Sequence, residues 1–120
     1  MNNQVIDHYR QAVEMVTAPN AFLELTTIEQ DGHTLKAYKH APGSMRDLWM
    51  LGQGYGDQEY IVYGDERWTF AEAGQIVANF ATWLQTQNIG AGDRVAIAVR
   101  NYPEWSFAYW GAIAVGGAVA

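Results

Sequence analysis

The C-terminal part of the chain constrains its fold most, because its residues read strand, helix, strand. Val95 to Val99 is an unbroken apolar run, which predicts a strand covered on both faces. Asn101-Tyr102-Pro103 then turns the chain into a helix expected over about Glu104 to Val115, since proline suits the first helical position. Gly116-Gly117 ends that helix, and Ala118-Val119-Ala120 begins a further strand. This order predicts a βαβ unit with parallel strands and a right-handed crossover.

The predicted helix of this unit is apolar almost all round, which favours a place between two layers. Its large apolar side chains are Trp105, Phe107, Trp110, Ile113 and Val115. The strand that begins at Ala118 has only started at Ala120, so we expect the sheet to be incomplete with these elements. The predicted fold class is α/β, the start of a layered α/β domain with an N-terminal helix, a β-hairpin and one βαβ unit, truncated.

The first forty residues predict the helix and the hairpin. Apolar residues at three- and four-residue spacing indicate a helix from about Asn3 to Thr17. Asp31-Gly32 stands between the β-prone stretches Ala21 to Glu29 and Thr34 to His40. Aspartate followed by glycine is a strong hairpin signal, because glycine accepts a positive φ without steric cost.

The middle of the chain predicts two helices and a second pair of strands. Ser44 is expected to cap a short helix from Met45 to about Leu51. Tyr60 to Tyr63 and Arg67 to Thr69 are short strand candidates around a Gly64-Asp65-Glu66 turn. Thr69 and Glu72 form a capping-box pattern, which opens a helix expected to run to about Gln87. The buried face of this helix is expected to contain Phe70, Val77, Phe80, Ala81 and Leu84.

Two segments are predicted along the chain, and the glycines from Gly52 to Gly56 are the candidate connection between them. Residues 1–58 hold the N-terminal helix, the hairpin and the short helix, and residues 59–120 begin a larger domain. A net charge of −6 with only seven Lys and Arg disfavours nucleic acid and anionic membrane surfaces as partners. There is no cysteine, and no apolar stretch reaches the length of a spanning helix. We expect no integral membrane segment and, since no secretory signal is seen at Met1, a cytoplasmic location.

Residues 60–120 resemble the N-terminal region of the AMP-forming acyl-CoA synthetases of the adenylate-forming superfamily. Trp68-Thr69-Phe70-Ala71-Glu72 is similar to that family's Leu-Thr-Tyr-x-Glu-Leu motif, with Ala73 where leucine is usual. The run from Gly111 to Val119 is similar to its second motif, rich in Ala and Gly. Gly92-Asp93-Arg94-Val95 and Asn101-Tyr102-Pro103-Glu104 lie between them and resemble two further signatures.

The resemblance implies a parent enzyme that activates a carboxylic acid with ATP and Mg²⁺ as an acyl-adenylate and passes the acyl group to coenzyme A. The family's Ser/Thr/Gly-rich phosphate loop, its adenine motif, its metal-binding Glu and its C-terminal lysine have no counterpart in these residues. We therefore assign no catalytic, cofactor-binding or metal-binding residue to this chain. ATP, Mg²⁺ and coenzyme A are expected cofactors of the parent, and the remainder of the parent polypeptide is the expected partner.

Several residues allow a functional interpretation beside a structural one. The glycines of Gly52-Gln53-Gly54-Tyr55-Gly56 could hold phosphate, but a connector fits their spacing better. His8, His33 and His40 lack the paired spacing of metal ligands. Asp57, Glu59, Asp65 and Glu66 could serve acid–base work, although turn chemistry explains them. Trp105, Tyr109 and Trp110 could stack on a ligand, although core packing suits helical spacing; Arg100 and Asn101 follow a strand end, where ligands often bind.

Two hypotheses follow. The first is an N-terminal scaffold of an ATP-dependent fatty acyl–CoA ligase, inactive by itself and prone to self-association through apolar surface around Trp105, Phe107 and Trp110. The alternative is a small, self-sufficient α/β protein-interaction module without catalysis.

Overall fold

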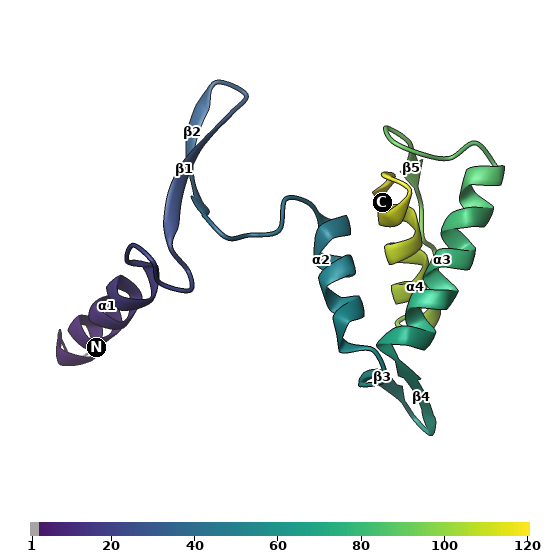
Figure 1. Cartoon of the computed structure of the whole chain (residues 1–120), viewed down its shortest axis with the longest axis horizontal. Helices are drawn as coiled ribbons and strands as arrows, with labels where there is room; N and C mark the ends of the chain where they lie inside the picture. The colour runs from purple at the N-terminus through teal and green to yellow at the C-terminus, as the bar shows by residue number, and fades with distance from the viewer. Residues whose placement is uncertain (1–2) are drawn as a thin grey trace. The chain divides into compact units, whose positions relative to one another are not determined.

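The computed structural model describes residues 3–120, and the chain divides into two compact units, residues 1–42 and 43–120 (Figure 1). Met1 and Asn2, which belong to the predicted N-terminal segment, lie outside the described residues. Helices and short strands alternate along the chain, which confirms the predicted α/β class. Each unit is built from local signals in its own sequence. The predicted division after residue 58 concerns the larger domain and stays a prediction.

The first unit contains one helix and one hairpin. Helix α1 covers Asn3–Thr17, as predicted, and strands β1, Leu25–Gln30, and β2, His33–Tyr38, pair antiparallel. Asp31 and Gly32 connect them with φ of 51° and 77°, the left-handed pair that a two-residue hairpin turn requires. No described side chain of this unit is buried. The unit therefore holds its shape by hydrogen bonds and partly covered contacts, without a core.

The second unit begins with two helical pieces and a second hairpin. Ser44 caps α2, Met45–Gly52, where its Oγ accepts a hydrogen bond of 3.0 Å from the Asp47 N–H. A single turn of 3-10 helix, η1, follows at Gln53–Tyr55. Strands β3, Glu59–Tyr63, and β4, Glu66–Thr69, then pair antiparallel, so Glu66 belongs to the strand and the turn is shorter than predicted. The predicted short helix and strand pair are thus confirmed.

Helix α3 covers Phe70–Thr86 and starts at the predicted capping box. The Thr69 Oγ1 accepts from the Glu72 N–H at 3.1 Å, and the Glu72 Oε2 accepts from the Thr69 N–H at 2.9 Å. These two bonds satisfy N–H groups that a helix start leaves without partners. The box therefore fixes where β4 ends and α3 begins.

The βαβ unit is present, with a smaller sheet than expected. Helix α4, Pro103–Ala114, connects β5, Arg94–Val95, to β6, Ala118–Val119, and the two strands pair in parallel. The prediction of a strand from Val95 to Val99 covered on both faces is wrong in its extent. The ladder continues only through the Ile97 N–H, which donates to the Ala120 carbonyl at 3.1 Å, and Val99 is 52% exposed. A parallel strand needs hydrogen-bonded neighbours along its length, and β6 pairs with only the first residues of this run.

The core of the second unit lies between α2, α3, α4 and the β3–β4 hairpin. Its buried apolar residues are Trp49, Ala73, Val77 and Phe107, with Tyr60, Ile61, Trp68 and Trp110 packed against them. On α3, Val77 and Leu84 are buried as predicted, whereas Phe70, Phe80 and Ala81 are only half-buried. On α4, the buried residues include Phe107 and Gly111, while Trp105 is 39% exposed, so this helix is covered less fully than predicted.

No helix in residues 3–120 combines the length and the apolar character needed to cross a membrane.

Candidate functional site

The aromatic residues of α4 are covered to different extents by the rest of the second unit. Trp110 stacks on Trp49 with ring centroids 5.0 Å apart and planes inclined by 22°. Its indole Nε1–H donates to the Tyr60 hydroxyl oxygen at 2.8 Å, and that hydroxyl shares a second 2.8 Å hydrogen bond with the Ser106 hydroxyl. These hydrogen bonds and the ring stacking hold α4 against β3 and α2. Trp110 therefore belongs to the core, as the helical spacing predicted.

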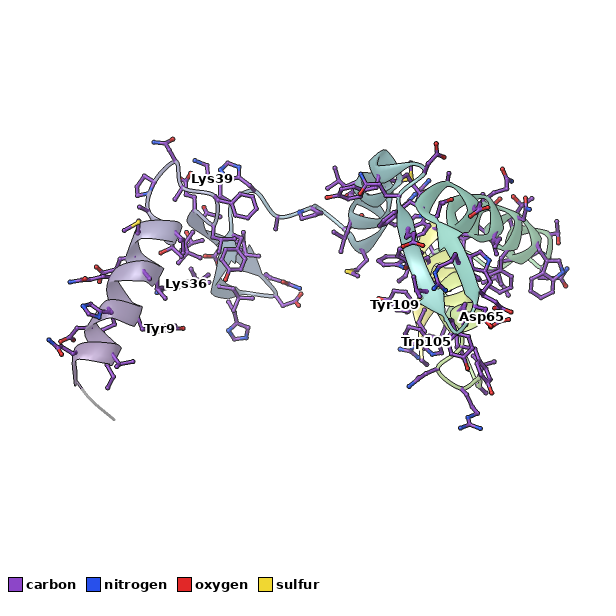
Figure 2. The ribbon with its side chains drawn as sticks, turned by 90° about the horizontal axis from the view of Figure 1, so that it is seen from below. Tyr9, Lys36, Lys39, Asp65, Trp105 and Tyr109 are labelled. Carbon is purple, nitrogen blue, oxygen red and sulfur yellow. The ribbon has the colours of Figure 1, made fainter. Side chains whose placement is uncertain are left out.

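Trp105 and Tyr109 lie one turn apart on α4, and both are partly accessible (Figure 2). Their rings stack with centroids 5.3 Å apart and planes inclined by 13°. Tyr109 is half-buried and also meets Trp110 edge to face, with centroids 5.1 Å apart, so it packs as its helical spacing predicts. Trp105 is 39% exposed, so the prediction of core packing is wrong for this residue, and its ring is available to a ligand or a partner.

A hollow of about 300 Å³ lies where the start of α4 meets the end of β3. Three aromatic side chains, Tyr63, Tyr102 and Trp105, line it together with Asn101 and Ser106, and we call it the aromatic hollow. The rings of Tyr63 and Tyr102 meet edge to face, with centroids 5.7 Å apart and planes at 89°.

A second hollow, of about 350 Å³, shares Tyr63 and Tyr102 with the first and adds the carboxylates Glu66 and Glu104; we call it the acidic hollow. Asn101, which the sequence placed after a strand end, lines the aromatic hollow. Arg100 lines neither hollow, and its carbonyl accepts from the Tyr102 N–H at 2.7 Å. The contribution of Tyr63 had no sequence signal, because its contact with Tyr102 joins residues far apart in the chain.

The glycine-rich segment 52–56 does not form a phosphate cradle. It closes α2 and forms η1, where the Gly56 N–H donates to the Gln53 carbonyl at 3.1 Å and the Gln58 N–H to the Tyr55 carbonyl at 3.0 Å. The N–H groups of Gln53 and Gly56 are therefore used within these helical turns, whereas a phosphate site needs several free N–H groups aimed at one point. A β-carbon on Gly52 would come within 3.5 Å of the Phe70 ring, so the connector is packed on α3.

The histidines and acidic residues do not converge on a metal site. Within residues 3–120, no three side chains of His, Cys, Asp or Glu approach one another closely enough to hold a metal ion. Glu59 faces the Arg67 Nε at 3.4 Å, and the Arg67 Nη1 donates to the carbonyl oxygens of Gly64 and Glu66, at 2.8 and 2.9 Å. These contacts hold the β3–β4 hairpin, which is the turn and strand chemistry that the sequence favoured.

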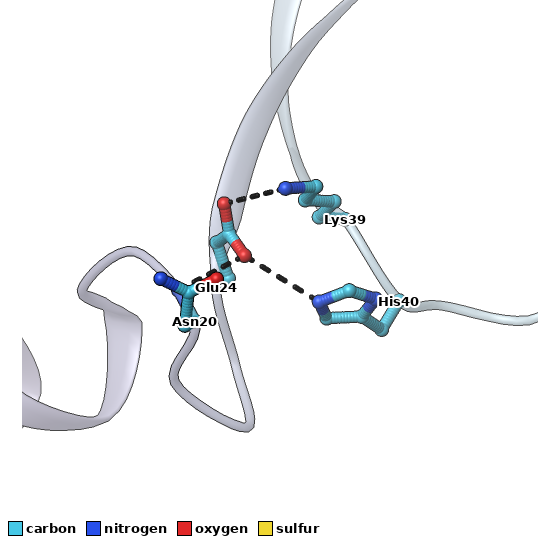
Figure 3. Close-up of polar contacts among 4 residues, drawn as sticks. All are labelled: Asn20, Glu24, Lys39 and His40. Carbon is cyan, nitrogen blue, oxygen red and sulfur yellow. Dashed lines mark hydrogen bonds and ion pairs between the residues drawn. The ribbon is translucent and has the colours of Figure 1, made fainter.

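Glu24 is the centre of the polar contacts in the first unit (Figure 3). Its carboxylate accepts from the Lys39 Nζ at 2.8 Å and from the Asn20 N–H at 3.1 Å, and His40 Nε2 lies 3.5 Å away. The hydrogen bond from Lys39, with that from the Asn20 N–H, lowers the pKa of Glu24 below its usual range. The side chain keeps only 13% of its surface exposed. These contacts join the residues before β1 to those after β2, which is a structural role, and they involve His40 without His8 or His33.

Comparison with known proteins places the second unit. Residues 48–120 match the model of the family described as AMP-binding enzyme. The chain is also similar to a medium/long-chain-fatty-acid–CoA ligase of Mycobacterium tuberculosis, FadD6, with 35% identity over 49 residues, which are 41% of this chain and 8% of that ligase. The chain thus spans far less than two thirds of the relative that it matches. The family match contains all the motifs on which the resemblance to AMP-forming acyl-CoA synthetases rests and covers more than half of the residues, so the chain belongs to the AMP-binding enzyme family.

Proposed function

We propose that this chain supplies N-terminal framework for an ATP-dependent carboxylic acid–CoA ligase that works through an acyl-adenylate. The observation that carries the proposal is the family match over residues 48–120. The similarity to a fatty-acid–CoA ligase suggests a fatty acid as the carboxylic acid. In this proposal ATP, Mg²⁺ and coenzyme A are bound by other residues of the enzyme, and the work takes place in the cytoplasm.

The packing of the motif residues supports a framework role. A β-carbon on Gly111 would come within 2.5 Å of the Phe80 ring, so glycine lets α4 approach α3 closely. A β-carbon on Gly117 would lie 3.2 Å from the Ala112 carbonyl oxygen, and Gly116 has a φ of 84°. The small residues of the second motif thus serve a tight return from α4 to β6. Thr69 and Glu72 of the first motif serve the helix cap.

A chimera tests the proposal directly. Residues 48–120 of this chain would replace the corresponding segment of the mycobacterial ligase, and fatty-acid-dependent formation of the CoA thioester would be measured. We expect activity in the chimera, and its loss when Gly111→Leu removes the close approach of α4 to α3. The matched control is Gly54→Ala, because a β-carbon there meets nothing within 4 Å. A folded chimera without thioester formation would contradict the proposal.

The isolated 120-residue chain offers a second test. We expect no exchange of pyrophosphate into ATP that depends on a carboxylic acid, because the groups that hold the triphosphate are proposed to lie in other residues. Acid-dependent exchange by the pure chain would refute this expectation.

The exposed apolar residues of the first unit favour a second candidate function, a protein-interaction module. Phe22 is 90% exposed, and Tyr9 and Met15 on α1 are also exposed, in residues that the family match does not cover. Apolar surface of this kind promotes association. Sedimentation velocity over a range of concentrations should show association of the unmodified chain and weaker association of the Tyr9→Lys variant. Monomers in both cases would contradict this candidate.

A further inference from the structure

The aromatic hollow has walls that suit a positive charge. Tyr63 lies at the end of β3, Tyr102 precedes α4, and Trp105 lies in the first turn of α4. The rings of Tyr63 and Tyr102 meet edge to face at 89°, and Trp105, one face of which stacks on Tyr109, completes the aromatic lining. Each aromatic face carries partial negative charge, so rings arranged around one space attract a cation placed among them.

The charged residues around the aromatic hollow also favour a cation. The acidic hollow, which shares Tyr63 and Tyr102, brings Glu66 and Glu104 beside the aromatic walls. Among the described residues, no Lys, Arg or His lines either hollow. Arg67, on the adjoining strand, is held by Glu59 and by two carbonyl oxygens of the hairpin. The protein therefore places two carboxylates beside the aromatic lining and none of its own described cations in either hollow.

The residue types that line the aromatic hollow restrict which kind of ammonium group it can bind. A primary ammonium carries three N–H donors that need acceptors once water is displaced. The aromatic hollow offers the side chains of Asn101 and Ser106 besides its tyrosine hydroxyls, and the Ser106 hydroxyl already shares a hydrogen bond with Tyr60. A quaternary ammonium needs no hydrogen-bond acceptor and loses less on leaving water. Ile61, Val62 and Pro103 complete the lining, and apolar side chains suit methyl groups better than N–H donors, so the hollow favours an alkylated cation over a primary one.

We propose that the aromatic hollow binds the trimethylammonium head group of a small molecule. The methyl groups contact Tyr63, Tyr102 and Trp105, and Glu104 and Glu66 balance the charge from the adjoining hollow. The proposal rests on the lining of the hollow and does not depend on the proposed ligase function.

Titration of the full chain with choline chloride at constant ionic strength tests the site, with the indole N–H resonance of Trp105 as the reporter. We expect a saturable shift with choline. The uncharged isostere of choline, in which a quaternary carbon replaces the nitrogen, should bind several-fold more weakly, and ammonium chloride should give no saturable shift. Equal binding of the isostere would overturn the proposal, because shape alone would then explain the binding. The absence of a saturable shift with choline would overturn it as well.

Variants locate the binding within the hollow. Tyr63→Leu is expected to weaken choline binding by about two- to fivefold, the effect of one cation–π contact, while Tyr63→Phe keeps the ring and most of the affinity. Trp83→Leu is the matched control, because Trp83 is 53% exposed on α3 and lines neither hollow. Glu104→Gln, at an exposed position that packs no core, should weaken binding about twofold at low salt. Choline affinity unchanged in both folded Tyr63→Leu and Glu104→Gln would refute the site.

Discussion

Gly111 is the position where one methyl group should reveal how tightly α3 and α4 pack. A β-carbon built there would lie 2.5 Å from the Phe80 Cδ1 and 3.4 Å from two further ring atoms. Carbon atoms rest at about 3.5–4.0 Å, so the ring must move by about 1 Å. Phe80 stacks on Trp83, with centroids 5.6 Å apart and planes inclined by 18°, which restricts that movement.

Two opposing effects decide how much Gly111→Ala changes the free energy of unfolding. Overpacking costs about 1–3 kcal/mol, whereas alanine is about 1 kcal/mol better than glycine inside a helix. The difference is a loss of about 0–2 kcal/mol in the free energy of unfolding, and because the Phe80 ring is only half-buried and can yield in part, we expect about 1 kcal/mol. Urea denaturation followed by tryptophan fluorescence would measure it as a lower midpoint at unchanged slope.

A double-mutant cycle separates the steric effect from any other. In the background of Phe80→Leu the clash is relieved, so Gly111→Ala should become neutral or stabilising there. Gly54→Ala, where the added carbon meets no atom within 4 Å, should leave stability unchanged or raise it by up to about 1 kcal/mol. If Gly111→Ala costs the same in both Phe80 backgrounds, or stabilises the parent chain, the close approach of the two helices is not what the glycine serves.

Three further predictions concern polar groups of the second unit. Tyr60→Phe removes the acceptor of the Trp110 indole N–H and should cost about 1–2 kcal/mol, seen in urea denaturation together with an upfield shift of that N–H resonance. Among the described residues, the buried Gln53 Nε2 has no hydrogen-bond partner. Gln53→Met should therefore stabilise the fold by about 1 kcal/mol and raise the thermal midpoint, and a lower midpoint would contradict this. The hydrogen bond from the Thr69 N–H, followed by that from the Thr69 hydroxyl, lowers the pKa of Glu72 from 4.5. The stability that ionised Glu72 contributes to the fold is therefore present above pH 4.5 and is lost as the pH falls through the lowered pKa. Stability measured from neutral to acid pH should therefore fall less steeply in Glu72→Gln, and an unchanged slope would count against the link.

Matched controls exist for two of these changes. Tyr55→Phe removes a hydroxyl from an exposed tyrosine whose ring packs on Phe70, and it should leave the urea midpoint nearly unchanged. Gln87→Met changes an exposed glutamine after α3 and should not raise the thermal midpoint.

The local elements of this fold were predictable because their signals act within a few residues. The pair Thr69 and Glu72 predicts the start of α3, Asp31-Gly32 predicts the first hairpin, and Ser44 predicts the start of α2. In each case the side chain bonds a backbone group at most three positions away, or the backbone needs a φ that few residues adopt. The family could be predicted for the same reason, because its motifs are helix caps and tight glycine turns formed by residues that follow one another in the sequence.

The extent of β5 and the composition of the hollows could not be predicted in this way. Val95 to Val99 reads as a buried strand, yet how far it pairs depends on the residues that another segment places beside it. Trp105 and Trp110 have the same spacing signal, yet Trp49 and Tyr60 cover one of them and leave the other at the rim. Tyr63 and Tyr102 meet only because α4 packs against β3.

The sequence by itself thus determined the helices, the turns, the parallel unit and the family, since these depend on short-range sterics and hydrogen bonding. Only the tertiary structure decided which aromatic rings are buried and which remain open around a space beside two carboxylates. Burial depends on which distant side chains arrive at the same place, and residue spacing along one element does not contain that information.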